Sequence, residues 1–550
     1  MTIPKLSDFP ESQQTPSLQS LVQLVQTLIT ENKLLNERVD VLTNTVSTLK
    51  EENQHLKDEI AILKEQKPRP KIQPSALEGS KSKDKEKKPR ISRGKHPRKK
   101  KKTMLEIHQE KVIQPTFIPE RAIFKGFKTY DVQDIIFKSC NTRFIIARWQ
   151  LPNGTYVCGE LPKGIHGHYG PELIAYILND YYACRITEPL LLDKLHQQGV
   201  LISEGQLNNI LIHGKNTFHQ EKNELLLAGI EAHNQIQTDD CGARHKGNNQ
   251  YTNVIGNEWF SIFTTTDSKS RVNFLRLLQA GKHEYLINED AVIYLEGLNA
   301  PSFLSGYISL SKGVKFSTLL DWQRFLAVQN ITQETAIRLV TEAALFASVI
   351  KNGIPRDLGV HGDDAGQFNA FVRSLCWIHE ERHYRKIVPA SEQARMDLEQ
   401  VRDKIWTIYR DLKVYQQSPN DTVKQVIEKQ FDDLFLCMET SSATLNRRLR
   451  MTYGKKQELL RVFERPDTPL HNNSSETDAR SAVTKRKVSG GTRSDEGKEA
   501  RDTFLSLKQT CRKLGINFIS FLKDRVSEVF EIPRLAEIIR QRSERTEAPS

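Results

Sequence analysis

Cysteine is scarce in this chain and is never arranged in the pairs that zinc-binding modules use. The seven cysteines of the 550 residues are scattered, and no two are separated by only two residues. They stand at positions 140, 158, 184, 241, 376, 437 and 511. A structural zinc site normally draws on two closely spaced ligand pairs, so we expect no structural zinc. An odd number of cysteines without framework spacing is typical of a reducing compartment.

Long apolar runs are also missing. No stretch approaches the roughly 20 apolar residues that a membrane-spanning helix needs, which excludes a membrane partner. Residues 1–20 lack the basic start and apolar middle of a signal peptide. Both absences predict a cytoplasmic protein, and the length leaves room for several domains.

Basic residues are in excess, with 80 Lys and Arg against 68 Asp and Glu and a formal net charge of +12. Such an excess favours contacts with nucleic-acid phosphates, although many soluble proteins are basic. It is concentrated in residues 67–115, which include KSKDKEKKPRISRGKHPRKKKK. This segment has too few apolar side chains to fold alone, so we expect a disordered linker, and a disordered N-terminus over 1–17. Lys99, Lys100, Lys101 and Lys102 would touch DNA phosphates without reading bases, or simply keep a linker solvated.

Residues 18–66 carry a heptad repeat. Alternating steps of four and three residues from Leu21 define a continuous seam along the helix. Every d position of this seam is Leu. The alternating a positions are Val25, Asn32, Val39, Val46, Asn53 and Ile60. β-Branched a residues with d leucines favour a parallel two-stranded coiled coil, and paired asparagines would fix its register. We therefore predict a homodimer or higher homo-oligomer; a helix folded against its own chain is the alternative.

Two small segments follow the linker. In the predicted β module, 116–165, Asn153-Gly154 lies between two β-rich runs and predicts a hairpin. Residues 166–225 have helical patterns, and Ser203 with Gln206 forms a capping-box signature. Two helices around a Gly-containing turn could be a helix-turn-helix, or part of a plain helical bundle. We predict that three amide side chains, which suit the edges of adenine bases, would read a DNA groove: Gln206, Asn208 and Asn209.

Three acidic residues stand in different settings. Asp239 and Asp363 each close a short apolar run, and Glu476 opens a helix-like stretch. Any one of them could be a solvated turn residue. Together, acids at the ends of strands and on a nearby helix can form a two-metal phosphoryl-transfer site, because Mg²⁺ prefers carboxylate oxygen. Basic residues that follow Glu476 are candidates for holding flanking phosphates, namely Arg480, Lys487 and Arg493.

Several motifs, in the same order along the chain, resemble those of one family. QTDDCGARH, DDAGQFNAF with LCWIHEERHY, and NNSSE with RKVSGG are similar to the blocks of DDE transposases of the insertion sequence 66 type, over roughly 165–530. The resemblance implies that Asp239, Asp363 and Glu476 are the catalytic, metal-binding triad, with Mg²⁺ as cofactor and Mn²⁺ as a substitute. It assigns no role to Asp240 or Asp364. The chain departs from the family pattern at Cys241, where Thr is usual, at His471, where Asp is usual, and in lacking the four-Cys zinc module of many relatives.

The resulting fold prediction is multidomain. An α/β RNase H-like catalytic domain would occupy 226–389 and 466–550, interrupted by a helical insertion at 390–465. The expected function is DNA strand cleavage and strand transfer by a nucleoid-associated transposase. Its partners would be element ends, target DNA and accessory element-encoded proteins. Two alternatives remain: a noncatalytic or decayed coiled-coil DNA-binding protein, and a metal-dependent nuclease without joining activity.

Overall fold

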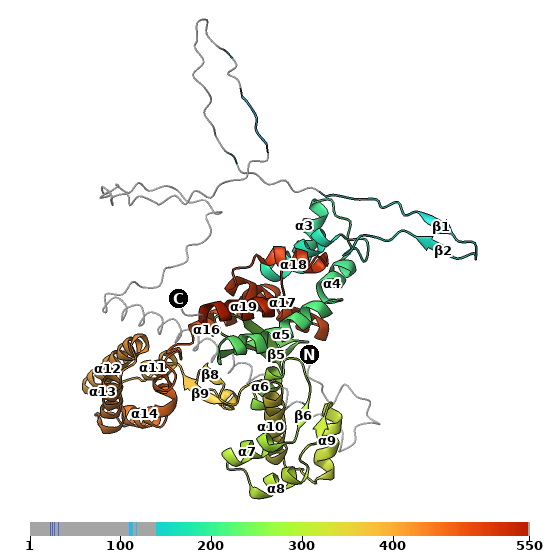
Figure 1. Ribbon diagram of the computed structural model, residues 1–550. Coiled ribbons are helices and arrows are strands. Elements are labelled where there is room, and N and C mark those ends of the chain that lie inside the picture. Colours follow the sequence, from blue (N-terminus) through green and yellow to red (C-terminus); the bar gives the residue numbers. More distant parts are fainter. Residues whose placement is uncertain are drawn as a thin grey trace. The chain divides into compact units, whose positions relative to one another are not determined.

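The computed structural model describes residues 139–547, together with separate positions at 23, 25, 27, 31, 109–113, 117 and 132. The chain divides into two compact units, Met1–Lys128 and Thr129–Ser550, and the helices and strands labelled in Figure 1 belong to the second. Apart from those separate positions, the predicted disordered N-terminus, coiled coil and basic linker lie outside the described residues. The same holds for Lys99, Lys100, Lys101 and Lys102.

The predicted hairpin is present. Strand β1 (Arg148–Gln150) pairs antiparallel with β2 (Tyr156–Cys158), with Trp149 opposite Val157. The turn uses Gly154 in the left-handed region, at φ +82°, and Asn153 Oδ1 accepts a hydrogen bond from the Thr155 amide. Of the Asn-Gly pair only Gly154 has positive φ, and Gln150 pairs with Tyr156 across the loop 151–155, so the connection is longer than the two-residue turn that Asn-Gly usually forms. All six strand residues are exposed.

Helices follow the hairpin as predicted. They are α2 (Pro171–Leu178), the π-helical turn η3 (Asn179–Ala183), α3 (Glu188–Gln197), α4 (Glu204–Ile212) and α5 (Asn216–Ala232). The capping box of α4 is confirmed, because Ser203 Oγ accepts from the Gln206 amide and Gln206 Oε1 accepts from the Ser203 amide. Their apolar faces share one core with the C-terminal helices α17 (Asp495–Lys513), α18 (Phe518–Val526) and α19 (Leu535–Glu547).

A five-stranded mixed sheet lies at the centre of the fold. Its strands are β3 (Gln235–His245), β4 (Asn248–Gly256), β5 (Ser261–Thr266), β8 (Gly359–Gly362) and β9 (Val372–Leu375). They run in the order β5-β4-β3-β8-β9, with the first three antiparallel and β3, β8 and β9 parallel. The two-residue link Lys246-Gly247 joins β3 to β4 with both residues at positive φ, as a tight hairpin turn requires. The strands predicted around Asp239 and before Asp363 are therefore confirmed.

Helices α16 (Asn473–Ser489) and α17 pack on one face of this sheet. Val254 of β4 and Phe263 of β5 form a buried cluster with Ala479 of α16 and Leu505 of α17. Strand β5 is followed by α6 (Arg271–Leu278), where Phe274 contacts Phe368 of the short η4 (Gly366–Phe368) edge to face.

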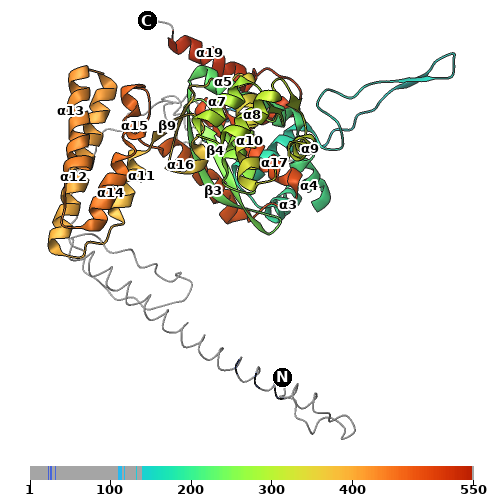
Figure 2. The same cartoon turned by 90° about the horizontal axis from the view of Figure 1, so that it is seen from below.

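Two mainly helical segments have cores of their own: the first separates β5 from β8, and the second lies between the last strand, β9, and α16. The first contains β6 (Tyr285–Leu286), α7 (Glu289–Gly297), α8 (Ser302–Leu310), β7 (Lys315–Phe316), α9 (Leu319–Val328) and α10 (Glu334–Lys351). The second contains α11 (Trp377–Arg385), α12 (Glu392–Gln417), α13 (Asp421–Asp432), η5 (Asp433–Cys437), α14 (Ala443–Tyr453), α15 (Lys456–Leu459) and η6 (Arg461–Phe463). Figure 2 shows α12, α13 and α14 side by side, which confirms the helices predicted for 390–465.

In that second core Tyr409 is buried and Trp406 packs against it, as expected for core residues. Within the described part of the chain, no helix combines the length and apolar composition that a membrane crossing needs.

Candidate active site

The register of two parallel strands brings Asp239 and Asp363 to neighbouring positions. The pairing of β3 with β8 ends at Gln237 opposite His361, and each acid stands two residues farther along its strand direction. Asp363 directly follows β8, as predicted. Asp239 does not end its strand, which corrects the sequence prediction: β3 continues to His245 because its second half pairs with β4.

The side chain of Asp239 belongs to the face of the sheet that α16 covers. Asp239 lies directly opposite Val254 in the β3–β4 ladder, and Val254 packs against Ala479 of α16. Opposed residues in an antiparallel pair project to the same face. Glu476 is in the first turn of that same helix, as predicted. The fold therefore directs strand and helix acids toward one region.

Electrostatics show that the three acids are close neighbours. Burial, together with the negative charges of Asp363, Asp240 and Glu476, raises the pKa of Asp239 to about 6. The hydrogen bond that the Asp240 amide donates to Asp239 Oδ1, at 2.8 Å, only partly offsets this. Partly desolvated carboxylates of like charge are the arrangement that a bound cation would stabilise.

Asp240 and Asp364 have cationic partners instead. Asp240 forms an ion pair with Lys269 and accepts a hydrogen bond from Gln367 Nε2 at 2.6 Å. Asp364 pairs with Arg373 at 2.6 Å and Lys455 at 2.5 Å. Burial opposes ionisation of Asp364, but these two cations hold its pKa below the usual range. Both acids are thus neutralised within the protein, which distinguishes them from Asp239.

Glu476 is surrounded by nitrogen donors. Its carboxylate lies 3.4 Å from Arg382 Nη2, 3.6 Å from His379 Nε2 and 3.8 Å from Arg480 Nη2. Arg382 Nη1 also lies 3.0 Å from His379 Nε2. Arg382 is not among the predicted site residues, although its three-residue spacing from His379 places both on one face of α11. Among the described residues, no three His, Cys, Asp or Glu side chains converge closely enough to hold a metal ion.

Cys376 and Asn472 join the elements that carry the acids. The Cys376 amide donates to the Gly362 carbonyl at 3.0 Å, and its Sγ accepts from the Asn472 amide at 3.3 Å. Asn472 Nδ2 donates to the Thr238 carbonyl at 2.8 Å. The starts of α11 and α16 are therefore fastened to β8 and β3. These contacts support a structural role for Cys376.

The predicted groove-reading amides already have intramolecular partners in two of three cases. Gln206 Oε1 takes part in the cap of α4 and accepts from the Tyr169 hydroxyl at 2.8 Å. Asn208 Nδ2 donates to Glu188 Oε1 at 3.2 Å. Asn209 is exposed on α4. Of the three amides, Asn209 is therefore the one whose side chain makes no hydrogen bond with the described residues.

The basic residues predicted near Glu476 lie at the surface. Arg480 and Lys487 are exposed on α16, and Arg493 is exposed in the turn before α17. Lys485 differs, because it is buried with Nζ donating to the Tyr181 carbonyl at 2.7 Å and lying 3.6 Å from that ring's centre. The exposed residues can reach a bound polyanion, whereas Lys485 fastens α16 to η3.

Comparison with known proteins gives two matches. Residues 364–500 match the family model described as "Transposase IS66 family", a range that contains Glu476 and begins directly after Asp363. A relative from Sinorhizobium fredii (strain NBRC 101917 / NGR234), named "Uncharacterized protein y4jO", is 40% identical over 304 residues. That alignment covers 55% of this chain and 94% of the relative.

Proposed function

The chain belongs to the IS66 family of transposases, and we propose that it cuts DNA at the ends of a mobile element and joins those ends to target DNA through Asp239, Asp363 and Glu476. The observation that carries this proposal is the strand register. It sets Asp239 beside Asp363 on the face where α16 presents Glu476. Three antiparallel strands followed by two parallel ones also support an RNase H-like assignment for the sheet.

The donor set suits a hard divalent cation. Three carboxylates, one of them with a raised pKa caused by burial and neighbouring negative charge, favour Mg²⁺, with Mn²⁺ as a substitute. When bound, these ions would activate water or a DNA 3′-hydroxyl and stabilise the leaving oxygen. Glu476 would exchange its arginine contacts for the cation, and Arg382 and Arg480 would then become available to DNA phosphates.

DNA contacts in this proposal are divided among several surfaces. Exposed Arg480, Lys487 and Arg493 would hold phosphates flanking the scissile bond, since their charges lie on α16 and the turn after it. The coiled coil predicted for 18–66 would bring two copies, and hence two element ends, together. Accessory element-encoded proteins remain a prediction.

The test is Mg²⁺-dependent cleavage and joining of DNA that carries the gene's own flanking ends. We expect Glu476→Gln to lose both activities, by at least about 100-fold, because the substitution removes an anionic ligand but keeps the side-chain shape. Glu334→Gln is the matched control, since Glu334 is also in the first turn of a helix but is exposed on α10.

Three outcomes separate the candidate functions. Cleavage and joining by the wild type, lost in Glu476→Gln alone, would support the transposase mechanism. Cleavage without joining would favour a nuclease. If the wild type binds the ends but neither cuts nor joins them with Mg²⁺ or Mn²⁺, the catalytic proposal fails and a noncatalytic DNA-binding protein is favoured.

A further inference from the structure

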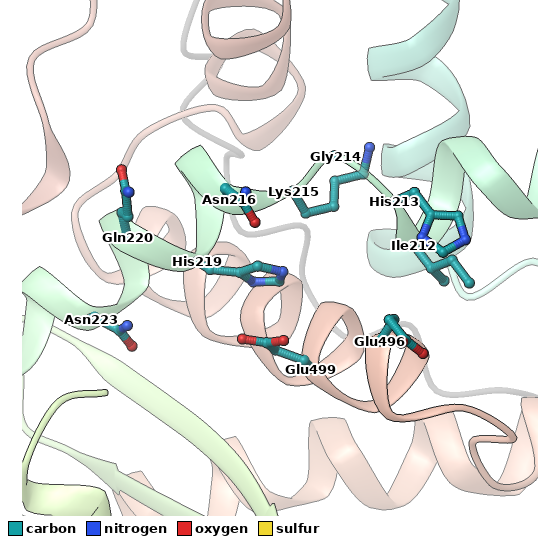
Figure 3. Close-up of a pocket in the computed structure, with 10 residues that line it drawn as sticks. All are labelled: Ile212, His213, Gly214, Lys215, Asn216, His219, Gln220, Asn223, Glu496 and Glu499. Atoms are coloured by element: carbon teal, nitrogen blue, oxygen red, sulfur yellow. The ribbon is translucent and has the colours of Figure 1, made fainter. Parts of the chain in front are cut away.

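Basic side chains can bind DNA phosphates only where neighbouring carboxylates do not cancel their charge. The polar cavity between the link from α4 to α5 and the first turns of α17 does not meet this condition, because Glu496 and Glu499 line it together with Lys215 (Figure 3). Two carboxylates against one ammonium group would repel a phosphate. Helix α11, whose Arg382 contacts Glu476, has a surface that does meet the condition.

One side of α11 presents a row of basic and imidazole side chains. Successive members of the row are three, one and three residues apart, so a period of 3.6 residues per turn aligns them. His379, Arg382, His383 and Lys386 make up this row, which we call the α11 stripe. The side chain of His379 is 26% exposed, and the other three residues are exposed. The stripe is therefore accessible to a ligand along its whole length.

The acidic residues of α11 lie on the other side of the helix and have cationic partners. Glu380 and Glu381 are only 4% and 5% exposed. Glu380 pairs with Arg448, and with Lys455 at 3.2 Å. Glu381 pairs with Arg402 at 2.7 Å. Because both acids are neutralised inside the helical insertion, neither opposes an anion that approaches the stripe.

Two permanent cations define the charge of the stripe. Burial lowers the pKa of His379 and His383, so near neutral pH the positive charges are those of Arg382 and Lys386, and the imidazoles are neutral hydrogen-bond donors. The two cations are four residues apart, about 6 Å along the helix axis, which is near enough for neighbouring phosphates of one strand. Among the described residues, Glu476 is the one carboxylate within ion-pair distance of the stripe.

We propose that the α11 stripe binds phosphates of the DNA strand that crosses Glu476, on the opposite side of the scissile bond from the phosphates held by α16. This inference rests on the transposase function proposed above and gives the helical insertion a part in holding the substrate. Arg480 and Lys487 follow Glu476 along α16, whereas the stripe leads away from it along α11. A strand over Glu476 would thus contact cations of two elements, which would position the DNA without reading its bases.

The first experiment measures binding of the full chain to duplex DNA that carries the gene's own flanking ends, over a range of salt concentrations and without divalent metal. Lys386→Gln should weaken binding about three- to tenfold and reduce the slope of log affinity against log salt by about one. Arg385→Gln is the matched control and should change neither, because Arg385 is exposed in the same turn but points about 100° away around the helix. Arg382 is not the test residue, since it also contacts Glu476.

Thermal unfolding shows whether the cations at the end of α11 serve only the helix, because cations in a last turn also interact favourably with the helix dipole. In that case Lys386→Gln and Arg385→Gln would lower the melting temperature by similar amounts and leave DNA binding unchanged, which would overturn the proposal. Equal losses of DNA affinity in the two variants would overturn it as well. The effect would then come from overall charge and not from one side of α11.

Uncharged methylphosphonate linkages, placed one at a time on either side of the element end, locate the contact. The linkage at the phosphate that Lys386 contacts should weaken binding by the wild type but have little further effect on Lys386→Gln. Equal weakening of the two proteins at every position would refute the contact between the stripe and this strand.

Addition of Mg²⁺ separates this proposal from the proposed function. If the wild type does not cut the ends, but Lys386→Gln still has a lower salt slope than Arg385→Gln, the proposed function fails and the stripe remains a DNA-binding surface. If the wild type cuts the ends and the two variants bind them alike, the stripe is refuted and the proposed function stands.

Discussion

At the scale of single residues, the candidate site is defined as much by its cations as by its acids. Asp240 and Asp364 resemble Asp239 and Asp363 in the sequence. In the structure, however, Asp240 pairs with a lysine, and Asp364 pairs with a lysine and an arginine. Lys269 and Lys455 lie far from those acids in the chain, so their pairing follows only from the fold. Glu476 differs again, because its nearest cation, Arg382, contacts it at 3.4 Å across two helices.

Arg382 should compete with the metal for Glu476. An exposed ion pair contributes about 0.2 to 1 kcal/mol, so Arg382→Gln should lower the half-saturating Mn²⁺ concentration by about two- to fivefold. Electron paramagnetic resonance of bound Mn²⁺ measures this without requiring activity. Arg385→Gln, exposed on the same helix, should have no effect. An unchanged or higher Mn²⁺ requirement in Arg382→Gln would show that Arg382 does not restrain Glu476.

At the scale of elements, the strands and helices around the acids were largely predictable because they have apolar periodicity. The end of β3 could not be predicted in this way, because the apolar run ends near Asp239 while the strand continues to His245. The polar second half of β3 pairs with Asn248, Asn249 and Gln250, so backbone hydrogen bonds extend the strand where hydrophobicity does not. The parallel register of β3 and β8 joins residues too distant in the chain for local patterns to predict.

The junction between α5 and β3 contains a pH-sensitive contact. His233 Nδ1 lies 3.0 Å from Glu258 Oε1, and His233 Nε2 lies 2.6 Å from Asp467 Oδ2. The hydrogen bond with Glu258, and to a smaller extent the one with Asp467, raises the pKa of His233 to about 9, although burial lowers it. The folded-state pKa exceeds the unfolded value of about 6.5. The stabilisation from this charged contact is therefore fully present below about pH 6.5 and is lost as the pH rises through about 9.

His233→Gln should therefore cost about 1 to 2 kcal/mol near pH 6 and little near pH 10, after allowing for the exposed carboxylates. Urea unfolding at both pH values measures the difference. His283→Gln, at an exposed histidine, is the control. Equal losses at the two pH values would mean that His233 stabilises the junction by packing rather than by charge.

At the scale of the whole molecule, segments from both ends of the described chain form one core. Helices α2 and α5, which precede the sheet, pack with α17, α18 and α19, which follow it. Arg525 of α18 joins them through Glu221 of α5, with both side chains 2% exposed. Arg525 also donates to the carbonyls of Ile532 and Pro533. The region after residue 500 is therefore integral to the fold, although the family match ends there.

This junction gives a prediction about global stability. Arg525→Met should reduce the free energy of unfolding by about 3 to 5 kcal/mol, because Glu221 and Asp524 would both remain buried without the arginine that pairs with them. Arg540→Met breaks an exposed pair with Glu231 between α19 and the same α5, and should cost less than about 1 kcal/mol. Combining Arg525→Met with Glu221→Gln should recover part of the loss, since Asp524 alone would then remain without its cation. If Arg525→Met costs no more than Arg540→Met in urea unfolding, α18 unfolds separately and the two ends of the described chain do not form one cooperative core.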